Sequence, residues 1–502
     1  MLQRLLTLED DVGCKEELYA ENNKMNTMNI IRIYFSISAI LLTATFCAAQ
    51  ENKPALTLQN CLDIAIANNI QVKQSELREQ ADKLNYNQAK YNRLPNVSAG
   101  INYGINNGRS IDPFTNSYNN QQLTSSNANL TASVPVFKGF QTQNYIKQAD
   151  LTYQATKMEL QQEKDNITLN VILSFLQLMN DEDVLALTNK QLVITQKQVE
   201  RLNVLNNEGS ISPSLLYDLK GQYAADQLAY VSAAKSVELS KLALGRLMNL
   251  PYNRDLQINR EGFDTTLTLY DATADNIYNN AIQSLAMVKA ADLRTLAATK
   301  GIKVAAAGLY PTLSLFGQLG SNYSSAASTL TFIGNTEVVS NDYVVVNGSN
   351  IPVITKQSNF TDQKINFLNQ YNNNLNTYAG ISLRVPIFSN FQTRSNIKLA
   401  RIEEKRNSYI AENTRVELRQ AIDEAHLNTS TAWDRYNILT EQVAAFDESY
   451  RTAEIRFNLG AINSVEYLIV KNNLDRANIN LTIARYEYLL RTKVLDFYQG
   501  RL

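Results

Sequence analysis

Residues that could carry catalytic or metal-binding chemistry are scarce in this chain of 502 residues. His426 is the single histidine and lies one position off a heptad stripe, which predicts a packing or surface role. Ser232 and Lys235 have Ser-x-x-Lys spacing, but they lie in one uninterrupted helical pattern without the companion motifs of that hydrolase class. Cys61 is predicted to be a small buried apolar residue. We therefore predict no enzyme activity, no cofactor and no metal site.

The balance of charges and the distribution of apolar residues exclude two further classes. Lys and Arg total 47 against 48 for Asp and Glu, a net charge of −1, so we expect no nucleic-acid partner. Beyond residue 46 no run of 18 apolar residues occurs, so no helix is predicted to span a bilayer. Any membrane contact would have to come from strands or from an amphipathic surface.

The first 49 residues carry the pattern of an export signal. A short apolar run follows a positively charged start and precedes Cys47-Ala48-Ala49, as in a secretory signal peptide. We predict a signal peptide at residues 28–49, cleaved after Ala49. Residues 1–27 are acidic and fit no export signal, so we interpret them as a misannotated extension upstream of the true start codon. Lipidation at Cys47 is a weaker alternative, because the bulky Phe46 precedes it.

The second half of the chain repeats the first. Val134-Pro135-Val136-Phe137 returns as Val385-Pro386-Ile387-Phe388, and 9 of 17 residues match from there at an offset of 251. The same offset relates Gly209 to Gly460. Earlier residues match at an offset of 216, so the second copy carries an insertion of 35 residues. The repeat predicts one duplicated architecture.

Four segments alternate apolar and polar residues with the period of a β-strand. They lie at about residues 96–106, 127–136, 312–320 and 377–387. Alternation gives each strand one apolar and one polar face, and strands of roughly 9–11 residues with this pattern are typical of outer-membrane barrels. A half-buried soluble sheet is the alternative for any single strand. Four strands at symmetric places in an exported chain favour the membrane.

Four strands cannot close a barrel, and open edges are not tolerated in lipid. A dimer would give about eight strands and a barrel filled by side chains, whereas a trimer gives about twelve strands and room for a lumen. Oligomerisation therefore follows from the strand count, and a conducting function favours a homotrimer in contact with outer membrane lipid. The long polar loop at residues 321–374 is expected to face outward and to contain a hairpin turning at Asn347-Gly348.

Helical periodicity follows each strand pair. The clearest apolar stripe runs from Leu418 to Phe457 over five heptads, as in a coiled coil. No Pro or Gly interrupts residues 390–459 or 140–208, and about 69 residues make a helix of roughly 100 Å. Helices of about 38 and about 40 residues flank each long helix, and we expect them to stack end to end beside it.

These elements predict a mainly α-helical protein with membrane β-strands. Each copy is a helix–strand–strand–long helix–helix unit, and three copies would supply the strands of a 12-strand β-barrel. The first repeat is predicted at residues 50–250, an equatorial linker at 251–273 and the second repeat at 274–502.

The strand pairs, the Val-Pro-Val/Ile-Phe motif before each long helix and the Gly-x-Ile helix tips resemble the TolC-type outer-membrane efflux family from Leu56 onward. The resemblance implies a trimer whose 12-strand β-barrel is continued by an α-helical coiled-coil tunnel, so that the two repeats are efflux-duct repeats. Such a trimer is the passive exit duct of a tripartite efflux system. Such a duct lies in the outer membrane of a diderm bacterium, with its helical part in the periplasm. Its implied partners are a periplasmic adaptor (membrane fusion) protein and an inner-membrane pump.

The resemblance also implies two kinds of site. In the family, the turns between the paired helices dock the adaptor, although a plain helix stop is the alternative. The matching residues here are Asn207, Gly209, Ile211, Leu459, Gly460 and Ile462.

In that family two carboxylates beyond the second glycine ring the closed tunnel entrance. Here those positions hold Glu466 and Ile469, so one acid of the pair remains. The family's acidic partner in the first copy is replaced by Leu215, with Asp218 three residues further on, and its arginine is replaced by Ile462. Glu466 and Asp218 are thus candidate gate residues. A ring of three Glu466 side chains would favour cations, whereas a solvent-facing glutamate is the alternative.

Two other functions fit the same patterns. Type I protein secretion uses the same tunnel architecture, and the sequence does not separate it from small-molecule efflux. From a different class, the chain could be a surface coiled-coil scaffold or adhesin. The four strands would then be left unexplained.

The signal-peptide interpretation makes the first testable prediction. The mature protein should begin at Gln50, because small residues precede the cut after Ala49. N-terminal sequencing of the protein purified from membranes measures this directly. A terminal peptide that begins before Met25 would contradict the interpretation of residues 1–27.

Overall fold

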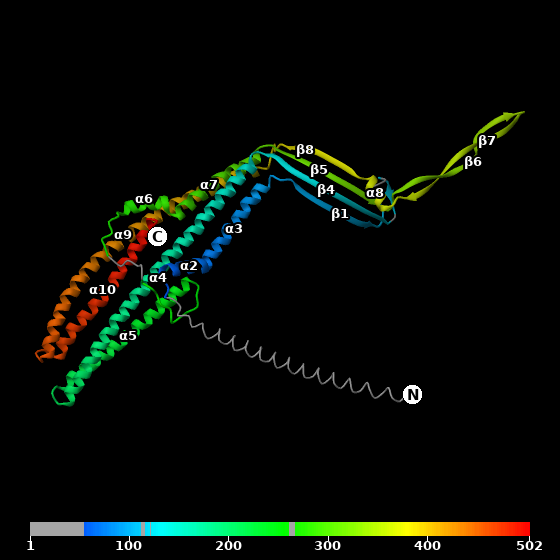
Figure 1. The fold of residues 1–502 in the computed structure, drawn as a ribbon. Coiled ribbons are helices and arrows are strands. Elements are labelled where there is room, and N and C mark those ends of the chain that lie inside the picture. The colour runs from blue at the N-terminus through cyan, green and yellow to red at the C-terminus, as the bar shows by residue number, and fades with distance from the viewer. Residues whose placement is uncertain (1–54, 112–115, 121, 261–266, 502) are drawn as a thin grey trace, which may run out of the picture. The chain divides into compact units, whose positions relative to one another are not determined.

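A computed structural model describes residues 55–111, 116–120, 122–260 and 267–501 (Figure 1). The predicted signal peptide at 28–49 and the extension at 1–27 lie outside these residues. Contacts divide the chain into two units. The smaller includes residues 55–58 and 255–260, where Leu56 and Ile258 form a parallel bridge. The larger holds nearly all the helices and strands. Among the described helices, none is long and apolar enough to cross a bilayer.

The first repeat contains two long paired strands, preceded and followed by helices of very different lengths. Its helices are α2 (Leu58–Asn68), α3 (Ile70–Tyr91), α4 (Gln141–Asn207) and α5 (Pro213–Leu247), and its long strands are β1 (Asn96–Asn106) and β4 (Leu123–Lys138). Two short strands, β2 (Ser110–Ile111) and β3 (Tyr118–Asn119), pair within the connection between β1 and β4.

The second repeat has the same order of elements. Its helices are α6 (Ala274–Ser284), α7 (Ala286–Ala306), the short 3-10 turn η1 (Ala307–Leu309), α8 (Phe367–Asn373), α9 (Gln392–Asn458) and α10 (Ser464–Tyr498). Its strands are β5 (Thr312–Ser324), β6 (Ser328–Val346), β7 (Ser349–Lys364) and β8 (Asn376–Arg384). The two long helices, α4 and α9, have 67 residues each, close to the predicted length.

The leading helices differ from the prediction, because each is divided into two. Asn69 is extended and caps α3, its Oδ1 accepting hydrogen bonds from the backbone N–H of Gln71 at 2.8 Å and of Val72 at 3.3 Å. An Asn side chain at this position satisfies backbone donors that a new helix would otherwise leave free. Leu285, in the second copy, has the same extended backbone between α6 and α7. The expected single helix of about 38 residues is therefore two helices.

The four long strands form one antiparallel sheet in the order β1-β4-β5-β8 (Figure 1). Its register aligns apolar residues on one face, such as Ile101 with Ala128, Leu130 with Leu319 and Leu315 with Ile381. β8 ends at Arg384, three residues before the predicted end at 387. Pro386 lacks the N–H that would continue the ladder. Pro135, the equivalent residue in β4, is accommodated by a register shift.

The inserted segment forms the long hairpin of β6 and β7. Asn347 and Gly348 connect the strands with φ angles of 48° and 84°. Positive φ at both central residues matches the right-handed twist of a two-residue hairpin, as the Asn-Gly pair predicts.

The shorter helices pack along the two long helices, α4 and α9. α3 packs on the first half of α4, where Thr156 Oγ1 donates to Asp82 Oδ2 at 2.6 Å, and α5 packs on its second half, where Thr195 Oγ1 donates to Asp226 Oδ2 at 2.5 Å (Figure 1). α7 packs on both α4 and α9, and α10 packs on α9 and α4, so the two repeats are joined. The predicted stripe on α9 is buried at Leu418, Ile422, Ala425, Thr429, Ala432 and Ala453.

Two glycines at turns offer a matched test of this packing. Both Gly139 and Gly209 have a left-handed backbone, with φ of 57° and 69°. A Cβ on Gly139 would lie 2.6 Å from Tyr310 Cβ and 2.8 Å from Ala307 O, whereas a Cβ on Gly209 meets nothing within 4 Å. Gly209→Ala should cost only the backbone strain of about 1–2 kcal/mol. Gly139→Ala should lower the thermal midpoint further, because a backbone carbonyl must move. Equal shifts for the two variants would contradict the packing at the strand-to-helix junction.

Candidate functional site

Both predicted helix tips are tight reversals closed by the same hydrogen bonds. At the first tip, the N–H of Ser210 donates to Leu205 O at 2.8 Å and the N–H of Gly209 donates to Asn206 O at 3.0 Å. At the second, Ala461 and Gly460 donate to Arg456 O and Phe457 O at 2.8 and 3.0 Å. This pair of bonds around a left-handed glycine is the Schellman motif, which satisfies the last carbonyls of a helix.

The next helix begins at once on the far side of each turn. Pro213 opens α5 at a position where its missing N–H costs nothing. Asn463 caps α10, its side chain accepting from the backbone N–H of Glu466 at 2.9 Å. The long helix and its returning partner are therefore rigidly connected at the tip.

The structure separates the six predicted docking residues into exposed and packed ones. Leu459 is 78% exposed, and Asn207, Gly209 and Gly460 are also exposed. Ile462 is buried against Ala453 and Tyr467, and the half-buried Ile211 packs on the cluster of Leu202, Leu216 and Leu219. The two isoleucines thus anchor the turns, and the exposed residues are the surface that a partner could reach.

The two predicted gate residues are not brought together. Asp218 Oδ2 accepts a hydrogen bond from Ser464 Oγ at 2.8 Å, which ties α5 to the start of α10. Glu466 lies 3.7 Å from Arg456 at the end of α9, and both side chains are about half exposed. Such an exposed ion pair contributes little to stability. Asp218 therefore links the two helical hairpins, whereas Glu466 contacts its own.

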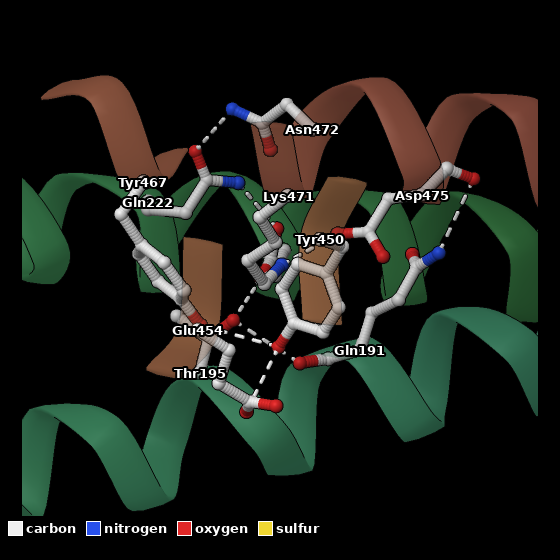
Figure 2. Close-up of polar contacts among 10 residues, drawn as sticks. Gln191, Thr195, Gln222, Tyr450, Glu454, Tyr467, Lys471, Asn472 and Asp475 are labelled. Atoms are coloured by element: carbon white, nitrogen blue, oxygen red, sulfur yellow. Dashed lines mark hydrogen bonds and ion pairs between the residues drawn. The ribbon is translucent and has the colours of Figure 1, made fainter. Parts of the chain in front are cut away.

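A buried polar cluster lies between the two hairpins and was not predicted. Figure 2 shows its side chains converging from α4, α5, α9 and α10. Lys471 Nζ lies 2.5 Å from Asp475 Oδ2 and 3.3 Å from Asp226 Oδ2, and the Lys471 side chain is 3% exposed. Asp226 also accepts from Thr195 Oγ1 at 2.5 Å and from Gln222 Nε2 at 2.6 Å. Lys471 thus joins α10 to α5 through a charge pair that water scarcely reaches.

Further polar contacts extend this cluster on both sides. Asn472 Nδ2 donates to Gln222 Oε1 at 3.0 Å, a second link between α10 and α5. The hydroxyls of Tyr450 and Tyr467 lie 3.2 Å apart and join α9 to α10 (Figure 2). Burial raises the pKa of both tyrosines, so both are neutral donors near neutral pH. The cluster therefore connects all four helices just beyond the tips.

The charges of this cluster are not fully balanced. One ammonium faces two carboxylates, and burial raises the pKa of Asp475 even though Lys471 next to it favours the charged form. Removing the ammonium would leave buried carboxylates without a compensating positive charge, which is far more costly than losing a surface charge. One feature of the sequence could have indicated this cluster. Lys471 lies four residues after Tyr467 and three before Leu474, which places a lysine on the buried side of α10.

The residues considered for catalysis lie in surroundings that fit a role in packing. The Ser232 hydroxyl donates to Leu228 O of its own helix at 2.8 Å. Cys61 is fully buried, and burial raises the pKa of its thiol to about 11. His426 is half-buried and lines a small cavity with Trp433 and Tyr488. Among the described residues no group of three His, Cys, Asp or Glu side chains could hold a metal ion.

The chain thus combines a sheet that has one apolar and one polar face with two very long helices, each of which follows a strand pair and has a returning partner. The chain belongs to the outer membrane efflux protein family, whose sequence profile matches residues 61–250 and 277–501. It is thus a TolC-like efflux channel protein. It lies in the outer membrane, with its helices in the periplasm.

Relatives of known sequence and structure agree with this assignment. Outer membrane protein TolC of Escherichia coli strain K12 is 21% identical over 410 residues, which cover 80% of this chain and 74% of that protein. TolC of Vibrio cholerae is 23% identical over 349 residues, 68% of each chain. The solved structures of CusC and of VceC from Vibrio cholerae both have a TM-score of 0.69. CusC is 14% identical and covers 88% of this chain and 91% of its own, and VceC is 13% identical and covers 88% and 96%.

The buried lysine gives a prediction with an internal control. Lys471→Met should destabilise the helical hairpins by about 3–5 kcal/mol, because it strands buried carboxylates. Adding Asp226→Asn and Asp475→Asn should recover most of that loss. Lys220 occupies the equivalent place in the first repeat but is exposed, so Lys220→Met should change little. Thermal melting of the helical circular dichroism measures all four proteins. If Lys471→Met melts like Lys220→Met, the cluster does not hold the hairpins together.

Proposed function

We propose that this chain is the outer-membrane exit duct of a tripartite efflux system. It is a passive channel that receives its cargo from an inner-membrane pump through a periplasmic adaptor protein. The observation that carries the proposal is the sheet of β1, β4, β5 and β8, whose apolar face and open edges require both lipid and further copies of the chain.

The edges of this sheet favour a homotrimer. Within the described residues, β1 pairs only with β4 and β8 pairs only with β5. Three copies would join β1 of one to β8 of the next and close a barrel of about twelve strands, which is wide enough for a lumen. The polar face, with Asn102, Asn129 and Gln318, would line that lumen, and the apolar face would meet lipid.

The helices would continue the lumen across the periplasm as a coiled-coil tunnel. At its far end, each copy contributes two tips, and three copies would surround the entrance with six. The Asp218–Ser464 hydrogen bond and the Lys471 cluster hold the hairpins of one copy side by side, which supports a closed entrance in the resting protein. Glu466, about half exposed beside the second tip, and the exposed Glu208 at the first tip are acidic residues available to the entrance.

The exposed tip residues form the proposed adaptor site. Asn207, Gly209, Leu459 and Gly460 project beyond the clusters that Ile211 and Ile462 anchor. Leu459 is 78% exposed, and Val465 and Ile469 of α10, just beyond the turn, are 58% and 56% exposed, so several apolar side chains at the second tip would be covered by a partner. A rigid turn with exposed apolar side chains suits docking of another coiled-coil tip.

A substitution at the helix tip tests the adaptor site separately from conduction through the duct. Leu459→Asp should abolish resistance to a panel of dyes, detergents and antibiotics in a strain that depends on this gene, because a charge would replace the apolar contact. The purified variant should still conduct ions in planar bilayers like the wild type. Val345→Asp is the control: Val345 is 60% exposed in the distal β6–β7 hairpin, so neither measurement should change.

The resistance and conductance measurements test different parts of the proposal. Because the resting entrance is proposed to be closed, conduction is also measured for Asp218→Ala, which removes the hydrogen bond from Ser464. Absence of conduction in both the wild type and Asp218→Ala would overturn the duct itself. A Leu459→Asp variant that keeps full resistance would overturn the adaptor site and leave the duct intact. A deletion strain with normal resistance that no longer releases a secreted protein would point to type I secretion.

A further inference from the structure

The short helix α8 is fixed to the sheet by buried hydrogen bonds. The Gln370 side chain is 1% exposed, and its Nε2 donates to Ser324 O at 3.0 Å and Ile365 O at 2.9 Å. Its Oε1 accepts from the Ser324 N–H at 2.9 Å. Asn374 Nδ2 donates to Asn322 O at 2.8 Å. A helix of seven residues would not persist alone, so these bonds determine where it lies.

Two serines show which face of the sheet α8 covers. Ser126 Oγ lies 2.7 Å from the Tyr371 hydroxyl, and Ser321 Oγ donates to Tyr371 O at 2.7 Å. Register pairs Ala128 with Ser321, and alternation places Ser126, Ala128 and Leu130 on one face of β4. That face is the apolar one. α8 therefore packs on the apolar side of the central strands β4 and β5.

The surface that α8 presents is uncharged, with Phe367 and Leu368 at its start and the exposed amides of Asn369, Asn372 and Asn373 after them. Leu368 is 70% exposed and Phe367 is 46% exposed. The Phe367 ring lies 5.0 Å from the Tyr323 ring and 4.6 Å from the Tyr371 ring, centroid to centroid. No charged residue occurs from 365 to 383. Tyrosines beside apolar side chains are typical of the boundary between lipid chains and headgroups.

We propose that α8 and Tyr323 form an anchor in the outer leaflet of the membrane, in which Phe367 and Leu368 insert among the acyl chains of bilayer lipid. The proposal rests on the proposed function, because it requires the apolar face of the sheet to face lipid. From Leu313 to Tyr323 the strand rises about 33 Å, which becomes roughly 25 Å across the membrane at a tilt of about 40°. This equals the height of the apolar band of such barrels, so α8 lies at its outer boundary.

The position of α8 favours lipid over a second copy of the chain. Further copies can add only at the edges, beside β1 and β8. The contacts of α8 are with β4 and β5, which already have strand partners on both sides. The face of α8 is therefore continuous with the lipid-facing surface of the barrel and lies away from the joints between copies.

Spin labelling at three positions tests the anchor in the full-length protein reconstituted into phospholipid bilayers. In a background in which Cys14, Cys47 and Cys61 are all replaced by Ala, a nitroxide is attached at Leu368→Cys, at Ile381→Cys on the apolar face of β8, and at Val345→Cys in the distal hairpin. All three native side chains are more than half exposed, so the labels should be tolerated. The readout is the ratio of collisions with oxygen, which enters lipid, to collisions with a water-soluble nickel complex.

The ratio at position 368 should be several-fold higher than at 345 and below that at 381. A ratio at 368 equal to that at 345 would place α8 in water and overturn the anchor. Suppressed collisions with both reagents would mean that protein covers it, which would also overturn the anchor. If the label at 381 itself behaves like the one at 345, the sheet is not in lipid and the proposed function fails instead. Adding Gln370→Ala should lower the ratio at 368 and leave 381 unchanged.

Discussion

The open edges of the four-stranded sheet are the constraint on which the rest of the molecule depends. β1 and β8 each have a neighbour on one side in the described part of the chain, yet one face of the sheet is apolar along its length. In lipid, a backbone N–H or C=O without a partner costs several kcal/mol, because no water replaces the lost hydrogen bond. In the proposed trimer, further copies of the same edges would satisfy these groups. Because each copy contributes two equivalent strand pairs, each followed by a long helix, closing the strands would also arrange the helices around one axis.

Beyond the sheet, the helices are held by two kinds of interaction with different consequences. Apolar stripes such as Leu418, Ile422 and Ala425 supply most of the burial, but many small shifts along a stripe would bury nearly as much. Lys471 with Asp226 and Asp475 accepts one arrangement only, because any shift strands a buried charge. The equivalent Lys220 of the first repeat is exposed. The two repeats therefore differ where the hairpins meet. Lys471 in α10 is buried and fixes the position of α10 against α5, whereas the equivalent lysine in α5 does not.

Most of the fold could be predicted because its signals are periodic and local. The runs without Pro or Gly predicted the long helices to within two residues at each end, alternation predicted the four strands, and Asn347-Gly348 predicted the hairpin. The break at Asn69 was missed because one capping side chain decides it within an otherwise helical pattern. The Lys471 cluster was missed because Lys471 and Asp226 are 245 residues apart, and the register between two hairpins leaves no periodic trace. The exposed tip residues follow from family resemblance, whereas the inward packing of Ile462 required the structure.

The most direct test of the account is electron microscopy of the detergent-solubilised protein at a resolution that separates strands. The account predicts a hollow particle with three-fold symmetry, in which β8 of each copy pairs with β1 of the next in a closed barrel of about twelve strands and helices of about 100 Å continue the lumen. A monomer, or a particle in which these two edges do not pair with each other, would contradict it.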